Sequence, residues 1–109
     1  MARLTAQFWV SAYLARLRMA AIPAYVTFRG DTTAGSVCVK LATLDGSARA
    51  FQRSFDLLTG ERRWMTLVEG AEAEVDAALR RQRDRDPDLW VIEVEDRAGR
   101  HLLDEDGIA

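Results

Sequence analysis

The stretch "DPDLWVIEVEDRAGRHLL", residues 86–103, is the most regular part of the chain and indicates its fold. Residues 90–95 alternate between an apolar side and a side that carries two glutamates, as in a strand with one buried face. Residues 96–99, "DRAG", predict a type I turn with the glycine where a positive φ is favoured. Residues 101–103 are then expected to return as a short second strand.

The carboxylates of this stretch have a second interpretation. Glu93 and Glu95 lie on one side of the strand, and together with Asp86, Asp88 or Asp96 they could hold a hard cation. A solvated face is the simpler interpretation, because half-buried antiparallel strands normally carry polar residues on one side. We therefore predict no metal site here.

The composition is that of one globular domain spanning residues 1–109. Apolar residues make up 49% of the chain and charged residues 29%, a balance that argues against disorder and allows one core. The single cysteine, Cys38, excludes an intramolecular disulfide and a cysteine-rich zinc site, so a reducing, cytoplasmic compartment is expected. The acidic tail, residues 104–109, is expected to fray.

Charge is distributed unevenly along the chain. Residues 1–68 carry 9 basic and 4 acidic side chains, whereas residues 69–109 carry 6 basic and 13 acidic ones. Such asymmetry is compatible with a basic face for an anionic partner. The simpler interpretation is that the two halves neutralise each other within one domain.

The N-terminal region predicts an amphipathic helix from Thr5 to Ala21. Thr5 is a suitable N-cap, and Pro23 disfavours the helical conformation just before it. Phe8 and Trp9 widen the apolar surface beyond one stripe, so they are candidates for contact with a second copy of the chain. The stripe itself consists of Val10, Tyr13, Leu14, Leu17 and Ala21.

The same region does not predict a membrane segment. Gln7 and Ser11 interrupt its apolar residues, and Arg16 and Arg18 follow where a signal peptide would stay apolar. A membrane span needs about 20 apolar residues. We expect a helix packed on a sheet, and no membrane partner.

Turn residues separate the four strand-like segments that follow. Asp45 and Gly46 predict a type I′ hairpin turn and Gly60 a second turn, so we expect an antiparallel meander. A second helix, residues 71–85, has acidic residues first and arginines last, which suits the helix dipole. The segments are "AYVTFRG" (24–30), "SVCVKLAT" (36–43), "ARAFQRSF" (48–55) and "RWMTLV" (63–68).

These elements predict a single α+β domain in the order α-β-β-β-β-α-β-β. Its sheet is mostly antiparallel, and both helices pack on it. The predicted core comprises Val10, Leu14, Leu17, Val26, Phe28, Val37, Val39, Leu41, Val75, Leu79, Trp90, Ile92 and Val94.

The third strand carries the pattern that most favours nucleic-acid binding. Its Arg49, Phe51, Arg53 and Phe55 share one side, so the rings could stack on bases while the arginines contact phosphates. Lys40 on the preceding strand would add a further phosphate contact. The alternative is that the phenylalanines pack on a helix and the arginines extend to solvent. We favour this alternative, because no RNA-binding motif accompanies the strand.

The segment "GDTTAGSVCVK" suggests a degenerate nuclease-like site. In such metal-dependent hydrolases acids bind magnesium and a lysine helps to activate water. Asp31 and Lys40 would be the remaining members, with Glu93 and Glu95 as further carboxylates. Cys38 occupies the position of an expected metal ligand, which weakens the hypothesis. The segment has no phosphate-binding glycine motif.

The remaining chemically reactive side chains have ordinary structural interpretations. His101 is the only histidine and has no nucleophile motif around it, so we predict a surface or strand-end residue. Cys38 alternates with valines on a strand, which predicts an inert, partly buried thiol.

Four segments of the chain are distinctive: "FWVSAYL", "RGDTTAGSVCVK", "LDG" and "DPDLWVIEVEDRAGRHLLDE". In these segments the chain resembles a family of small bacterial proteins known as domain of unknown function 1491. The resemblance covers nearly the whole chain and is most specific over residues 86–105. It implies a stand-alone cytoplasmic bacterial protein, and it implies no reaction, cofactor or functional residues.

The sequence favours a small non-catalytic interaction or regulatory module, with no cofactor and no metal. We expect it to bind an unidentified protein partner or itself, as a homodimer, through Phe8, Trp9 or an open sheet edge. Nucleic-acid binding through the arginine- and phenylalanine-bearing strand is the first alternative. A degenerate metal-dependent, nuclease-like hydrolase is the second.

Overall fold

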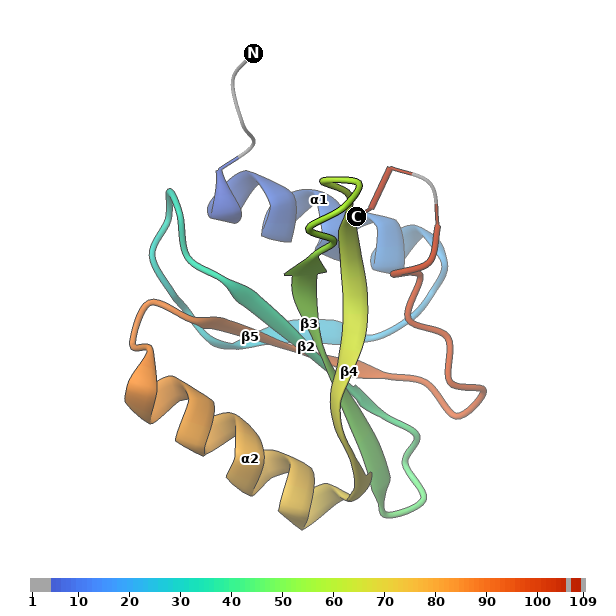
Figure 1. Cartoon of the computed structure of the whole chain (residues 1–109). Helices are drawn as coiled ribbons and strands as arrows, with labels where there is room; N and C mark the ends of the chain where they lie inside the picture. Colours follow the sequence, from blue (N-terminus) through green and yellow to red (C-terminus); the bar gives the residue numbers. More distant parts are fainter. Residues whose placement is uncertain (1–4, 106, 109) are drawn as a thin grey trace.

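The segment around Trp90 forms a strand inside a five-stranded sheet in the computed structural model, which describes residues 5–105, 107 and 108. Of Phe55 it describes the backbone alone. The single α+β domain, the mostly antiparallel sheet and the two helices are confirmed. The elements are α1 (Ala6–Met19), β1 (Ala24–Phe28), β2 (Val37–Ala42), β3 (Ser47–Phe55), β4 (Arg62–Ala71), α2 (Glu72–Arg85) and β5 (Trp90–Glu95) (Figure 1).

The sheet has the strand order β1-β5-β2-β3-β4, with β5 antiparallel to β1 and parallel to β2. The predicted meander is confirmed for β2, β3 and β4 and wrong for β1, which pairs with β5. The reason is that β5 is apolar on both sides. Ile92 and Val91 point to opposite faces, and both are buried. A strand with two apolar sides belongs in the interior of a sheet.

One helix covers each face of the sheet (Figure 1). α1 packs on the face that carries Trp90 and Ile92, and α2 packs on the face that carries Cys38 and Val91. The prediction that this second side of β5 is solvated is therefore wrong at Val91, which is 2% exposed. The structure has two small apolar cores, one on each side of the sheet.

α1 begins and ends close to the predicted residues. The Thr5 hydroxyl accepts a hydrogen bond from the Phe8 N–H at 3.1 Å, which confirms the N-cap. Trp9 is buried in the α1-side core, while Phe8 stays exposed. α2 carries Glu72 in its first turn and arginines in its last turn, as predicted from the helix dipole.

The loop between β1 and β2 packs tightly on the end of β5. The Asp31 N–H donates to the Asp88 carbonyl, and the Trp90 indole N–H donates to the Asp31 carbonyl at 2.7 Å. A Cβ at Gly30 or Gly35 would lie 2.0 or 2.4 Å from the Asp88 carbonyl oxygen. The two glycines therefore permit this close backbone approach. The loop buries the Trp90 side chain.

Ten of the thirteen predicted core residues are buried. Leu14 and Val26 are partly buried, and Phe28 is 37% exposed, so its prediction is wrong. The strand register shifts between Val26 and Phe28, so a bulge at Thr27 turns the next side chain to the opposite face. Phe28 there lies under the Arg83 guanidinium, whose Cζ is 4.7 Å from the ring centroid.

The hairpin between β2 and β3 exists, but its turn differs from the prediction. Positive φ angles occur at Leu44 and Gly46 rather than at Asp45 and Gly46. The Asp45 carboxylate accepts hydrogen bonds from the Thr43 hydroxyl and the Ser47 N–H, which stabilise this longer turn.

The turn after β5 is confirmed, but no strand returns from it. The Gly99 N–H donates to the Asp96 carbonyl at 3.0 Å, and Gly99 has a φ of +79°. Residues 101–103 pair with no strand among the described residues. Leu102 has a φ of +61°, which is incompatible with continued extended backbone.

The C-terminal tail docks on α1, so the prediction that it frays is wrong for the described residues. The Tyr13 hydroxyl donates to the His101 carbonyl and the Trp9 indole N–H donates to the Ile108 carbonyl, both at 2.7 Å. Leu103 and Ile108 are buried in the α1-side core. These apolar side chains outweigh the acidic composition of the tail. Residues 106 and 109 of the predicted tail lie outside the described residues.

Candidate functional site

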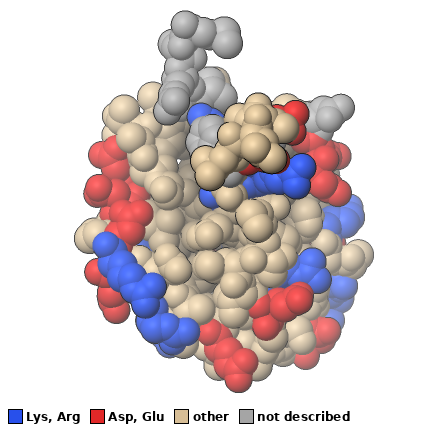
Figure 2. Space-filling model, in the orientation of Figure 1, with Lys and Arg blue, Asp and Glu red and all other residues tan. Residues whose placement is uncertain are grey.

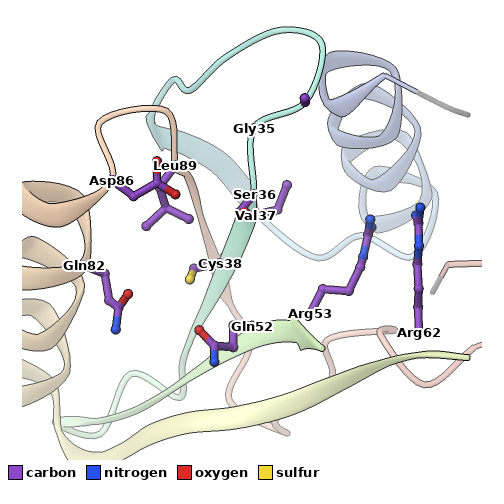
Figure 3. Close-up of a pocket in the computed structure, with 11 residues that line it drawn as sticks. Gly35, Ser36, Val37, Cys38, Gln52, Arg53, Arg62, Gln82, Asp86 and Leu89 are labelled. Carbon is purple, nitrogen blue, oxygen red and sulfur yellow. The ribbon is translucent and has the colours of Figure 1, made fainter. Parts of the chain in front are cut away.

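A cleft of about 380 Å³ lies at the end of the sheet where β2 begins, β3 ends and α2 ends. Figure 3 shows Gln82 of α2 and Asp86, the C-cap of that helix, on one side of the cleft. Arg53 and Arg62 lie on the other side, close to α1. Cys38 lies between these two sides. The volume is within the range of small-molecule sites, about 300–1,000 Å³.

The Arg53 guanidinium lies between two tryptophan rings. Its Cζ is 4.8 Å from the ring centroid of Trp9 and 5.1 Å from that of Trp64, within cation–π distance of both. The two indoles are themselves 5.3 Å apart, centroid to centroid. Thus β3 and β4 bring a cation against α1 at the edge of the cleft.

Three buried hydrogen-bond donors in this stack lack an acceptor among the described residues. They are Nε and Nη2 of Arg53 and the indole Nε1 of Trp64. Burial of the Arg53 guanidinium, and repulsion from the positive charge of Arg62, lower the pKa of Arg53 to about 10. The group still carries its charge at neutral pH.

The opposite part of the cleft is neutral or acidic. Burial, with a smaller contribution from the Asp86 charge, raises the pKa of the Cys38 thiol to about 11. The thiol is therefore protonated at neutral pH, and Cys38 is fully buried where the sequence predicted a partly buried thiol. Gln52 and Gln82 add amide groups, and Leu89 adds apolar surface.

Lys40 lies outside the cleft, in an ion cluster under α2. Its ammonium is 2.7 Å from carboxylate oxygens of Glu72 and Asp76 and 3.1 Å from one of Glu93. Burial disfavours the ammonium, but hydrogen bonds to these three carboxylates outweigh it and raise the pKa of Lys40. Tyr25 donates to the other Glu93 oxygen at 2.9 Å. The prediction that Glu93 is merely solvated is wrong.

The residues of the nuclease-like hypothesis are not assembled into a metal centre. The Asp31 carboxylate accepts hydrogen bonds from the Thr33 and Ala34 N–H groups in its own loop. The Asp31 carboxylate is not among the groups that contact Lys40. The Lys40 ammonium instead forms an ion pair with Glu93. Over residues 5–105, 107 and 108, no three His, Cys, Asp or Glu side chains are arranged to hold a metal ion.

The residues of the nucleic-acid hypothesis do not form one exposed surface. Phe51 is buried against α1, and Lys40 is enclosed by carboxylates. Arg49 extends to solvent and pairs with Glu69 at 2.9 Å, while Arg53 is held between the tryptophans. In the view of Figure 2 the centre of the face has few charged side chains, and charges of both signs alternate around its rim. The side chain of Phe55 lies outside the described residues.

His101 connects the C-terminal tail to β3. Its Nδ1 accepts a hydrogen bond from the Leu103 N–H at 3.0 Å, and its ring centroid is 4.7 Å from that of Phe51. Burial lowers the pKa of His101, the Asp104 charge opposes this shift and the Arg49 charge adds to it. The imidazole is a half-buried structural group.

Exposed apolar side chains concentrate at the hairpin between β3 and β4. Leu57 and Leu58 at its tip are each 96% exposed. Phe8 on α1 is 59% exposed, whereas Trp9 contributes to the core and presents no contact surface. Of the two predicted interaction residues, the structure leaves one available.

Sequence reasoning missed the cleft because its walls come from distant segments. Gln52, Gln82 and Trp64 carry no motif, and only the topology brings them near Arg53. The one available signal was the pair of arginines close to the ends of adjacent hairpin strands.

The comparisons with known proteins place the chain in a family. Residues 4–104 match the model of a family described as a protein of unknown function, DUF1491. The chain belongs to the DUF1491 family. The family description assigns no activity, and the search of curated proteins found no match.

Solved structures of similar proteins share the fold. A crystal structure of a DUF1491 family protein from Caulobacter crescentus CB15 is 40% identical, with a TM-score of 0.86, over 94% of this chain and 97% of that one. An NMR structure of a DUF1491 family protein from the same organism is 39% identical, with a TM-score of 0.82, over 96% of each chain. Protein Atu0922 from A. tumefaciens is 31% identical, with a TM-score of 0.73, over 86% of each chain.

In the part of the chain that the structure describes, no helix has the length and apolar character needed to cross a membrane.

Proposed function

We propose that this DUF1491 chain is a non-catalytic interaction module that self-associates through the hairpin between β3 and β4. The supporting observation is the nearly complete exposure of Leu57 and Leu58 at the hairpin tip. Two adjacent leucines in solvent leave apolar surface that a contact would bury. Phe8 is a further candidate for the contact.

The energy available from these leucines suits a weak dimer. Burial of one leucine side chain is worth about 1.5–3 kcal/mol. A two-fold contact would bury Leu57 and Leu58 of both copies, while association costs at least about 4 kcal/mol. The balance favours reversible association rather than an obligate dimer.

The charges beside the leucines favour a second copy as the partner. Asp56 and Glu61 lie at the hairpin together with Arg62 and Arg63, so both signs are present. In a two-fold contact the acids of one copy can face the arginines of the other. A strongly acidic or strongly basic partner would meet charges of its own sign.

The proposal also keeps the cytoplasmic location expected from the sequence. Cys38 is the only cysteine, so folding needs no oxidising compartment.

The experiment is sedimentation velocity over a wide range of protein concentration. We expect the weight-average mass of the wild type to rise with concentration. The mass of the Leu57→Ser/Leu58→Ser variant should stay at the monomer value at every concentration. Met19→Ser is the matched control. Met19 is 85% exposed at the C-terminal end of α1, outside the hairpin, so this substitution should leave association unchanged. A wild type that stays monomeric at the highest concentration would refute the proposal.

A further inference from the structure

The strongest unexplained feature of the molecule is the Arg53 stack. A buried donor without an acceptor costs about 1–3 kcal/mol, and more when it is charged. Within the described part of the chain, Nε and Nη2 of Arg53 are both in this state, and the neighbouring Trp64 Nε1 is a third such donor. All three are donors, so the missing group is an acceptor. An anion supplies acceptors and neutralises the guanidinium at once.

The Arg53 side chain lines the cleft, but its Nε and Nη2 atoms are buried, so a ligand would have to draw the guanidinium toward the cleft. Arg53 lines the cleft together with Arg62, whose positive charge adds to the attraction for an anion. Trp9 and Trp64 hold the guanidinium in place, which reduces the entropy lost when a ligand binds. In Figure 3 the two arginine side chains run side by side along one wall.

The other wall limits what the rest of the ligand can be. Asp86 would repel a second anionic group, and with Gln82 it offers acceptors to a hydroxyl or an amine. Between the two ends lie Gln52 and the neutral Cys38 thiol. The space of about 380 Å³ fits a small organic molecule rather than a polymer.

We propose that the cleft binds a small organic anion, with its carboxylate or phosphate against Arg53 and Arg62 and a hydrogen-bond donor toward Asp86. This site is independent of the leucine contact proposed above, since the leucines do not line the cleft. Binding of such an anion would make the interaction module responsive to a metabolite.

The test is an NMR titration of the full chain with three probes: inorganic phosphate, acetate and γ-aminobutyrate. We expect saturable shifts of the Arg53 Nε–H and of the Trp9 and Trp64 indole N–H signals. Saturation by phosphate alone would identify a phosphate ligand, and saturation by the carboxylates alone a carboxylate ligand. Tighter binding of γ-aminobutyrate than of acetate would support the donor toward Asp86. Linear, non-saturating shifts with all three probes would overturn the proposal.

Two variants separate binding from folding. Arg53→Gln should weaken binding about tenfold or more, the loss of one charge-assisted contact. Gln52→Glu leaves the stack intact and places a carboxylate in the cleft, so it should weaken binding similarly even if Arg53→Gln fails to fold. Arg49→Gln is the matched control, because Arg49 lies on the same strand outside the cleft. Equal binding by wild type and Gln52→Glu would contradict the proposal.

Discussion

Two cations on neighbouring strands are held in opposite ways. Lys40 of β2 faces α2, is 4% exposed and contacts the carboxylates of Glu72, Asp76 and Glu93. Arg53 of β3 faces α1, contacts two aromatic rings and has two nitrogens without an acceptor among the described residues. A fully paired charge such as Lys40 fixes an element in place, whereas a charge that lacks acceptors among the described residues can bind a ligand.

The Lys40 cluster joins three elements that are distant in sequence. Glu72 and Asp76 are one turn apart on α2, and Glu93 is the parallel register partner of Lys40 on β5. A single ammonium therefore ties α2 to the neighbouring strands β2 and β5. Three carboxylates around one cation also depend on that cation, because without it they would repel each other.

The largest effect is expected from Lys40→Met, which removes the cation that pairs with Glu72, Asp76 and Glu93. Three clustered carboxylates would lose their counterion, so the free energy of unfolding should fall by about 3–5 kcal/mol. Urea denaturation measures this change. Arg16→Met, which removes the exposed pair with Glu105, is the control and should change stability little. If Lys40→Met unfolds at the wild-type urea concentration, the cluster does not hold α2.

The contribution of Lys40 to the free energy of unfolding depends on pH in a defined direction. The pKa of Lys40 is raised in the folded state, so its contribution is fully present below the unfolded value, about 10.4. It is lost only as the pH rises through the higher folded value. Lys40→Met should therefore be less stable than the wild type at neutral pH, and as the pH rises from there this difference should persist until strong alkali.

A smaller effect is expected from Arg53→Met, which removes the guanidinium that lies between Trp9 and Trp64. The change removes two cation–π contacts worth about 0.5–1 kcal/mol each, but it also removes buried charged donors that cost a similar amount or more. Stability in urea should therefore fall by no more than about 1 kcal/mol. Arg49→Met, which removes the exposed pair with Glu69, is the control.

A different result for Arg53→Met would change the interpretation of the cleft. A loss as large as that of Lys40→Met would mean that Arg53 is a structural group. The proposed anion site would then have to be rejected as the reason for its unpaired nitrogens.

Much of the fold could be predicted from local patterns. Periodicity and turn residues located both helices and the strands up to β5. Thr5 caps the start of α1, and Gly99 completes the turn after β5, as expected. The strand order could not be predicted, because pairing of β5 with β2 joins segments about fifty residues apart. The bulge at Thr27 also had no local signal, and it alone moved Phe28 to the other face.

The candidate site was less predictable than the fold. Lys40 and Arg53 were both singled out as basic residues of strands. The sequence could not show that, among the described residues, three carboxylates surround Lys40 and no ion pair forms at Arg53. This difference arises from the two helices. α2 brings acids to its face of the sheet, and α1 brings Trp9 to the other.

The smallest effect concerns His101, a half-buried titratable group on the Arg53 side of the sheet. Burial lowers the pKa of His101 in the folded state, so unfolding takes up a proton as the pH falls below the ordinary value of about 6.5. Stability should therefore decrease as the pH falls from about 6.5, and level off below the folded pKa. Protonation of Nδ1 would also remove the acceptor for the Leu103 N–H.

The measurement for His101 is the thermal midpoint of the wild type and of His101→Asn between about pH 5 and pH 7.5. The asparagine oxygen can replace Nδ1 as acceptor for Leu103 but does not titrate in this range. As His101 is the only histidine, the difference between the two curves reports on this group alone. Parallel curves would show that the imidazole is not desolvated. Diverging curves would show that acid loosens the tail that covers Trp9, the ring on which the Arg53 guanidinium rests.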